Sequence, residues 1–177
     1  MNGLMRRNVN HQGSGYKIMG VKFMTIDGST TKTGVAYFCN GKYKKHYLLD
    51  YSKNKDIDQR FETMVIELWK LLNKHKPDII YMEDIYMANN AKTVRILTRL
   101  QGAVYAWCLQ NGCEFNTIAP TSWRKLLGFK QGQETRKLMK QQSVQYIYDT
   151  YKIEVSDDEA DAICIADAVL KKFANNA

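Results

Sequence analysis

The side chains best suited to chemistry are acidic, and two of them directly follow largely apolar segments. Asp27 closes the segment 21–26 and precedes a glycine, and Glu83 closes the segment 79–82. Segments of this kind are typical of buried strands. If the two strands are parallel neighbours, both carboxylates lie at one sheet edge, where they repel each other unless a cation joins them. For Asp27 alone, a turn aspartate that caps a loop is an alternative.

A second pair of acids begins the last predicted helix. Asp158 and Asp161 are three residues apart and share one helix face, in the first turns, where the helix dipole favours negative charge. Simple capping of the helix would explain Asp157 and Asp158 equally well. Asp161 differs, because its neighbours are apolar and predict that it is buried. A buried aspartate needs a partner, so we expect Asp161 to belong to a functional site.

Carboxylates from three separate parts of the chain predict an oxygen-ligand site for Mg²⁺, for which Mn²⁺ would substitute. Two such ions, about 4 Å apart, would activate water and stabilise the leaving oxygen during phosphodiester hydrolysis. His11, His46 and His75 have no acids at a spacing that suits histidine base catalysis. The cysteines form no CxxC pair and have no matching histidine spacing, so zinc is not expected. No organic cofactor is expected either.

The chain is basic, with 26 lysine and arginine residues against 18 acidic residues and a formal net charge of +8. Such an excess suggests an anionic partner, most often nucleic acid. The excess is concentrated in segment 122–140, where Glu134 is the one acid among several bases. We expect these bases to contact a DNA backbone, and a solvated helix face is the alternative. They are Arg124, Lys125, Lys130, Arg136, Lys137 and Lys140.

The predicted elements that position these residues are three strands in succession, followed by alternating strands and helices. Asn40-Gly41 predicts a tight hairpin between the second and third strands, because both turn positions need positive φ. Helices are indicated by apolar residues at helical spacing and by capping residues such as Ser156. Strands are expected at 21–26, 34–39, 42–50, 79–82 and 113–118, and helices at about 57–72, 90–110, 122–128, 134–148 and 156–173. This order predicts an α/β architecture, a mixed five-stranded sheet flanked by helices.

The length fits one globular domain, which we place at residues 19–177. Residues 1–18 hold no carboxylate and are predicted to be a disordered N-terminal extension. No apolar run approaches the roughly 20 residues that would cross a bilayer. We therefore expect a cytoplasmic protein without a membrane partner.

The predicted helix at 90–110 carries two apolar faces. Val94, Leu97 and Leu100 belong to one face, and Ile96 and Ala103 belong to the other. Two apolar faces predict that the helix packs on its own sheet and also on a second surface, for which a twofold-related copy is a candidate. A fully buried helix in a monomer would show the same periodicity.

Four blocks, in order, resemble the RuvC-type Holliday junction resolvases. They are 26–29 with Thr33-Gly34, 82–91 leading into 101–103, 120–128 with the basic segment after it, and 158–162. Together they extend over about 21–173, nearly the whole chain, and the second block is the most specific. The chain departs from the family pattern in lacking the proline usual after Asp27 and a histidine that some members have in the last block. These departures and the short tail suit a phage-encoded relative, acting in the cytoplasm of a bacterial host.

The resemblance implies a ribonuclease-H-like fold and a homodimer that nicks four-way DNA junctions symmetrically with Mg²⁺. It implies that Tyr86, three residues after the glutamate, wedges against bases at the crossover, and we expect Asn89 of the same block to contact DNA. The implied metal-binding and catalytic acids are Asp27, Glu83, Asp158 and Asp161.

Three alternatives stay open at the level of the sequence. A ribonuclease-H-like nuclease could act on another branched DNA or on an RNA–DNA hybrid with the same acids. An actin-like nucleotide-binding module would use a similar turn after Asp27, but it needs a second lobe for which this chain is too short. A non-catalytic junction-binding protein is the third, and the four intact acids argue against it.

Overall fold

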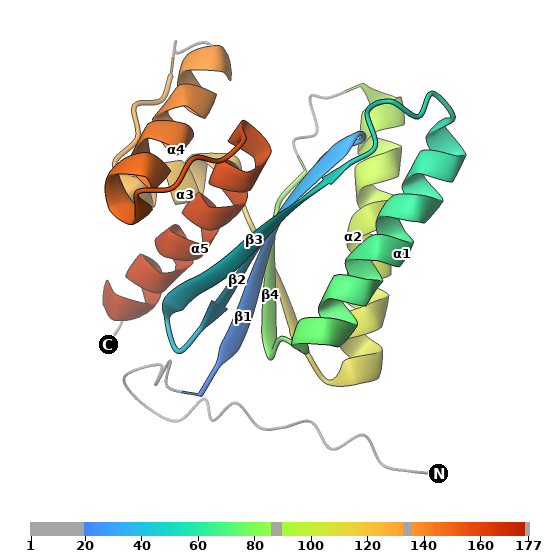
Figure 1. The fold of residues 1–177 in the computed structure, drawn as a ribbon, viewed down its shortest axis with the longest axis horizontal. Coiled ribbons are helices and arrows are strands. Elements are labelled where there is room, and N and C mark those ends of the chain that lie inside the picture. Colours follow the sequence, from blue (N-terminus) through green and yellow to red (C-terminus); the bar gives the residue numbers. More distant parts are fainter. Residues whose placement is uncertain (1–19, 86–89, 133–135, 176–177) are drawn as a thin grey trace.

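A computed structural model describes residues 20–85, 90–132 and 136–175, which form a twisted five-stranded sheet between two groups of helices (Figure 1). The strand order is β3-β2-β1-β4-β5. The first three strands pair antiparallel, whereas β1, β4 and β5 run parallel to one another. The strands are β1 (Lys22–Gly28), β2 (Lys32–Cys39), β3 (Lys42–Asp50), β4 (Ile79–Glu83) and β5 (Glu114–Ile118). The predicted mixed α/β sheet is therefore confirmed.

The helices cover both faces of the sheet, and each face has its own apolar core. One core includes Leu68 of α1 and Val104 of α2, and the other includes Ile163 of α5. None of the helices within the described ranges is long and apolar enough to cross a membrane. The two helices on one face are α1 (Ile57–His75) and α2 (Ala91–Asn111), and those on the other are α3 (Pro120–Leu127), α4 (Arg136–Tyr151) and α5 (Asp157–Asn175).

Local sequence signals account for most element boundaries. Asn40 and Gly41 have φ values of 56° and 70°, the pattern of the predicted hairpin turn. Ser156 and Glu159 cap α5 reciprocally, since each side chain accepts a hydrogen bond from the other residue's backbone N–H. The start of α3 differs from the sequence prediction, which placed it at about residue 122. That helix begins at Pro120 without a side-chain cap, because proline presets the helical φ and has no N–H to satisfy.

The strand register brings the ends of β1 and β4 together. Ile26 pairs with Met82 in the parallel ladder, so Asp27 and Glu83 follow paired residues at the same sheet edge. The end of β4 is fixed from two sides. Asp84 N–H donates to the Ile118 carbonyl of β5, at 2.9 Å. On the other side, Gln101 Nε2 of α2 donates to the Glu83 carbonyl, at 3.0 Å.

Helix α5 lies directly on β1 and β2. The buried Thr25 hydroxyl of β1 donates to the Ala162 carbonyl at 2.6 Å. At Gly34 of β2 the approach is so close that an added Cβ would lie 2.0 Å from the Asp158 carbonyl oxygen. Because Gly34 pairs with Asp27, this approach brings the beginning of α5 beside the end of β1.

The predicted N-terminal extension, residues 1–18, lies outside the described residues. So do Tyr86 and Asn89, to which the sequence assigned DNA contacts.

Candidate active site

Four predicted acids converge where β1, β4 and the first turns of α5 meet. Burial raises the pKa of Asp27 well above its ordinary value, and the neighbouring carboxylates of Glu83, Asp161 and Asp158 raise it further. Lys140 opposes part of this effect. Asp27 is thus within electrostatic range of the other three acids, although they lie far apart in sequence.

Asp161 is buried, as its apolar neighbours predicted, with 5% of its surface exposed. Burial raises its pKa to about 6, and the charge of Glu83 adds to this rise. The neighbouring Ser143 hydroxyl and Arg124 offset part of the rise. Among the described residues, no hydrogen-bond partner meets the buried Oδ1 of Asp161. A buried carboxylate oxygen of this kind is costly unless a cation or a donor reaches it.

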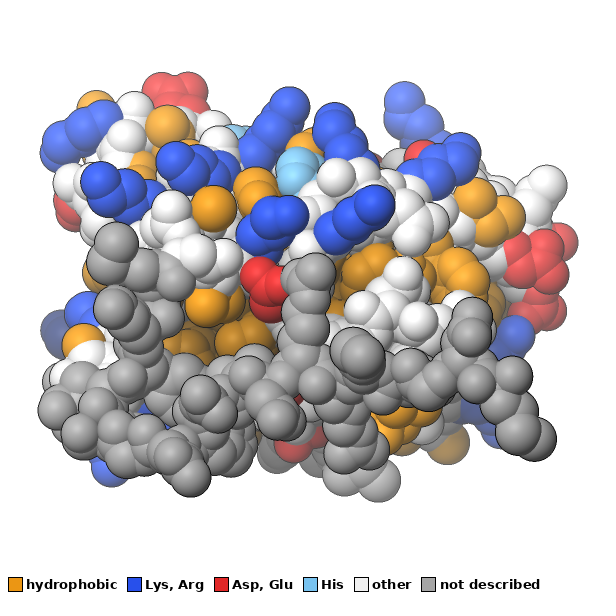
Figure 2. All heavy atoms as spheres, turned by 90° about the horizontal axis from the view of Figure 1, so that it is seen from below, with side chains coloured by type: hydrophobic (Ala, Val, Ile, Leu, Met, Phe, Trp, Pro, Cys, Tyr) orange, Lys and Arg blue, Asp and Glu red, His pale blue; other side chains and the backbone are white. Residues whose placement is uncertain are grey.

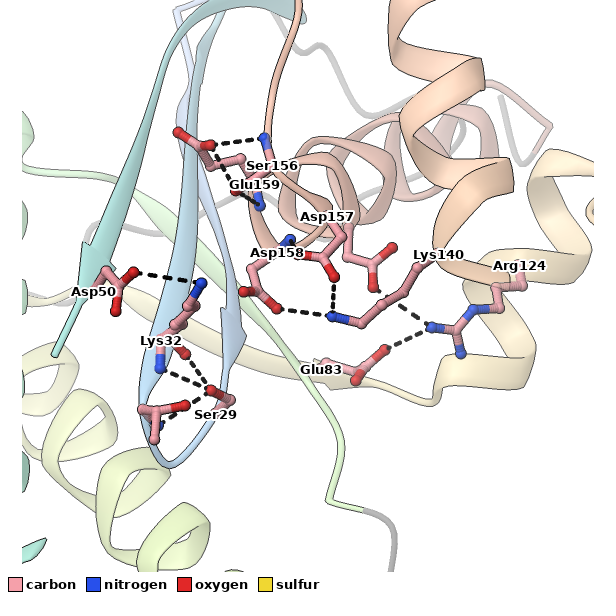
Figure 3. Close-up of polar contacts among 12 residues, drawn as sticks. Ser29, Lys32, Asp50, Glu83, Arg124, Lys140, Ser156, Asp157, Asp158 and Glu159 are labelled. Carbon is pink, nitrogen blue, oxygen red and sulfur yellow. Dashed lines mark hydrogen bonds and ion pairs between the residues drawn. The ribbon is translucent and has the colours of Figure 1, made fainter. Parts of the chain in front are cut away.

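Two residues of α3 contact the acids from the side of the helical layer, and Figure 3 shows one of them, Arg124, beside Glu83. The indole Nε1 of Trp123 donates to Glu83 Oε1, at 2.8 Å. Nη2 of Arg124 lies 3.8 Å from the same oxygen and 3.8 Å from Asp161 Oδ2. The Arg124 side chain is 14% exposed, so it lies among the acids and not on an open surface.

Lys140 of α4 neutralises the beginning of α5 in the same way (Figure 3). Its Nζ lies 2.5 Å from Asp157 Oδ2 and 3.2 Å from Asp158 Oδ1. Burial by itself would lower the pKa of Lys140, but its hydrogen bonds and ion pairs with the two aspartates raise it above the ordinary value. Asp157 and Asp158 therefore place negative charge in the first turn of α5, where the helix dipole favours it, and they also bind the Lys140 ammonium group.

The donor set fits a hard divalent cation. It consists of carboxylate oxygens, which Mg²⁺ and Mn²⁺ prefer, and one oxygen of Asp161 is buried without a partner in the described structure. Within the described residues, no three acidic, histidine or cysteine side chains are already arranged around a metal position. The ion pairs give the reason, because Arg124 lies beside Glu83 Oε1 and Asp161 Oδ2, and Lys140 binds Asp158 Oδ1.

The predicted DNA-contacting bases divide into two groups. Arg124 and Lys140 contact the acids, whereas Lys125, Lys130 and Lys137 are exposed. Lys130, Lys137 and Lys140 line a hollow of about 940 Å³ that also reaches Asp157. The hollow therefore adjoins the acids through Lys140, which lines it and also binds Asp158. The side chain of the remaining base, Arg136, lies outside the described part of the structure.

A further basic surface lies at the other end of the strands, and the sequence analysis did not single it out. Lys42, Lys44 and Lys45 are exposed on β3, which begins beside the start of β1 and not beside Asp27. Lys45 and Lys74 lie 5.3 and 6.0 Å from the ring centroid of Tyr47. Figure 2, which shows this end of the molecule, has lysine and arginine side chains along one side. Positive charge is thus not confined to segment 122–140.

Trp123 is the site residue that the sequence analysis missed. It lies inside the third block of family resemblance, but tryptophan in a short helix predicts only burial. No local signal indicates that its indole N–H meets a carboxylate 40 residues earlier in the chain.

A protein-family model described as "Crossover junction endodeoxyribonuclease RuvC" matches residues 23–168, most of the chain. The chain belongs to the RuvC family. A RuvC of Fusobacterium nucleatum is 27% identical over 150 residues, which are 82% of this chain and 77% of that protein. A RuvC of Caldicellulosiruptor saccharolyticus is 21% identical over 152 residues, covering 82% of this chain and 90% of that protein.

Solved structures of resolvases have the same fold. The Thermus thermophilus RuvC structure superposes on this RuvC-family chain with a TM-score of 0.67 at 16% identity, over 88% of this chain and 98% of that one. The Fowlpox virus resolvase, solved with substrate Holliday junction DNA, gives a TM-score of 0.59 at 14% identity, over 85% and 97% of the two chains. The expected ribonuclease-H-like fold and the resemblance to RuvC are thereby confirmed.

Proposed function

We propose that this RuvC-family endodeoxyribonuclease resolves four-way DNA junctions by divalent-metal-assisted hydrolysis at the four acids Asp27, Glu83, Asp158 and Asp161. The observation that carries the proposal is the convergence of these acids, which the β1–β4 register and the close approach of α5 at Gly34 bring about. Burial, and then the other three carboxylates, raise the pKa of Asp27 there. Acids that destabilise one another in the protein alone are suited to binding a cation. The family assignment supports a crossover junction as the substrate.

The four acids would bind the metal ions from two sides. Asp27 and Glu83 would bind from the sheet edge, and Asp158 and Asp161 from α5. With Mg²⁺ or Mn²⁺ bound, two ions would supply an activated water and stabilisation of the leaving oxygen. The chain itself orients these acids through the β1–β4 register and the packing of α5. Arg124 and Lys140, now paired with the acids, supply positive charge that a DNA phosphate can share.

We propose that two copies of the chain act together, because paired symmetric nicks need two active sites. Helix α2 supports this proposal. Its Tyr105 and Leu109 are 50% and 55% exposed, and the Tyr105 ring packs at a tilt against Phe115 of β5, with centroids 5.6 Å apart. Large exposed apolar side chains grouped on one helix are typical of a protein interface. We propose the cytoplasm as its location, because these relatives are bacterial and bacterial DNA lies there.

A junction cleavage assay tests the function. Synthetic four-way junctions are incubated with Mg²⁺, Mn²⁺ or EDTA, and both nicks are mapped. We expect metal-dependent, symmetric nicks across the junction, and we expect Asp161→Asn to bind junctions but not to cut them. Cutting of an RNA–DNA hybrid in place of the junction would favour the alternative substrate, and junction binding without any cleavage would exclude an enzyme. Sedimentation of the same preparation tests the dimer.

A further inference from the structure

We infer that Trp123 is a positioning residue for the site, holding the Glu83 carboxylate in a fixed orientation through its indole N–H. The inference rests on the metal-binding role proposed for Glu83. It assigns a role to a residue that lies inside the third block of family resemblance but to which the sequence analysis gave no function.

The donor of this hydrogen bond, Trp123, is buried, whereas its acceptor, Glu83, is partly exposed. Trp123 is 0% exposed, and its Nε1 lies 2.8 Å from Glu83 Oε1, while the Glu83 side chain is 22% exposed. A hydrogen bond from a neutral donor to a carboxylate is stronger than one between neutral groups. Since an indole N–H can only donate, the bond has one possible direction.

The indole itself is held from several sides. The ring packs edge-on against Phe129, with centroids 5.9 Å apart, and the Arg124 guanidinium carbon lies 4.3 Å from the ring. Phe129 is in turn tied to α3, since its N–H donates to the Arg124 carbonyl at 2.9 Å. A ring packed in this way cannot turn without moving the end of α3.

Glu83 is therefore held at both of its ends. Gln101 binds its backbone carbonyl, and Trp123 binds its carboxylate. A carboxylate fixed in this way loses less side-chain freedom when it binds a cation. Partners of this type typically change metal affinity or activity by about 10–100-fold when they are removed.

Trp123 and Arg124 contact the same oxygen but differ in what they can do when a cation arrives. Arg124 is charged and competes with a cation for Glu83. The indole is neutral, so its hydrogen bond to Oε1 persists beside a bound cation. The geometry thus gives Trp123 the lasting positioning role and makes Arg124 the exchangeable partner.

Trp123→Phe removes the donor while keeping an aromatic ring in the core. We expect its dissociation constant for Mn²⁺, measured by calorimetry, to rise about 10-fold or more. We expect kcat on junctions to fall by a similar factor while KM for the junction stays within about 2-fold. Trp107→Phe is the matched control, because Trp107 is also buried and its indole donates to Asn73 at 2.8 Å, away from the acids. Unchanged Mn²⁺ affinity and kcat in Trp123→Phe would overturn the inference.

Nuclear magnetic resonance of the unsubstituted chain keeps the test independent of whether Trp123→Phe folds. We expect the indole N–H signal of Trp123 to move on addition of Mg²⁺ and in Glu83→Gln, while the signals of Trp69 and Trp107 stay in place. If the Trp123 signal does not move in Glu83→Gln, the positioning role is refuted and the proposed function is not. Full cleavage by Glu83→Gln would refute the proposed function instead, so the two failures are distinguishable.

Discussion

At the scale of single residues, the acids of the site are in conflict, because burial and mutual repulsion disfavour their charged forms. Asp27 and Asp161 are raised in pKa mainly because burial disfavours their charged forms, and neighbouring carboxylates add to the cost. Arg124 and Lys140 relieve part of this cost without removing it. Residues that lower the stability of the folded protein in this way are typically retained for function and not for stability.

Asp27→Asn tests this conflict through stability. A pKa raised in the folded state means that the folded chain holds a proton that the unfolded chain releases, so stability falls as pH rises from about 4 through the raised pKa. At pH 7.5 in EDTA we expect the variant to melt roughly 3–8 °C higher than the unsubstituted chain, with a smaller gain at pH 5. Cleavage should be lost.

Thermal melts at both pH values provide the measurement, with Asp58→Asn as a control, because the Asp58 side chain is 81% exposed and far from the acids in sequence. The control should melt within about 1 °C of the parent at both pH values, as exposed substitutions usually do. A lower melting temperature for Asp27→Asn at pH 7.5 would contradict the idea of a conflict between acids.

At the scale of elements, the placement of α5 decides whether two of the acids reach the site. Its reciprocal cap fixes where the helix begins, the Thr25 hydroxyl ties it to β1, and Gly34 lets it approach β2. Position 34 must lack a side chain, because a Cβ there would overlap backbone atoms of Asp158 and Glu159 and no flexible side chain could move aside.

Gly34→Ala therefore should displace the beginning of α5. We expect destabilisation of about 1–3 kcal/mol, as for other overpacked cores, and at least a 10-fold loss of junction cleavage. Gly102→Ala in α2 is the matched control, since nothing lies within 4 Å of an added Cβ there. It should be neutral or stabilising by up to about 1 kcal/mol. Denaturant titration and cleavage rates measure both variants, and an active, stable Gly34→Ala would refute the close approach.

At the scale of the whole molecule, positive charge lies at both ends of the sheet while the acids lie at one. Lys130 and Lys137 line the hollow that reaches Asp157. Lys44 and Lys45 lie on β3, near its beginning and thus toward the opposite end. Net charge alone would attract DNA to the hollow and to the β3 surface, but of these two only the hollow adjoins the proposed site.

Two double variants of equal charge separate these surfaces. Lys130→Gln/Lys137→Gln should weaken junction binding uniformly across sequences and reduce the slope of log K against log salt by about 2, because each released phosphate contact contributes about 0.9. Lys44→Gln/Lys45→Gln should leave both quantities nearly unchanged. Binding titrations between about 50 and 200 mM salt measure the slopes. Equal effects of the two double variants would show that total charge, and not the hollow, governs binding.

Much of the fold could be predicted from the sequence, because it depends on near neighbours in the chain. Periodicity identified the five strands, the Asn40-Gly41 turn set the hairpin, and Ser156 with Glu159 set the start of α5. The four acids could be selected for the same reason. Asp27 and Glu83 end strands, and Asp161 is an acid within an apolar stretch.

Only the tertiary structure decided which side chains meet the acids. The pairing of Arg124 with Glu83 and Asp161, and the indole bond from Trp123, join residues about 40 positions apart. These contacts depend on how α3 packs on α5 and on the rotamers that bring its side chains to the end of β4, which no local pattern encodes. Strand ends and helix faces follow from backbone periodicity, but the partners of a buried carboxylate follow from the packing of layers.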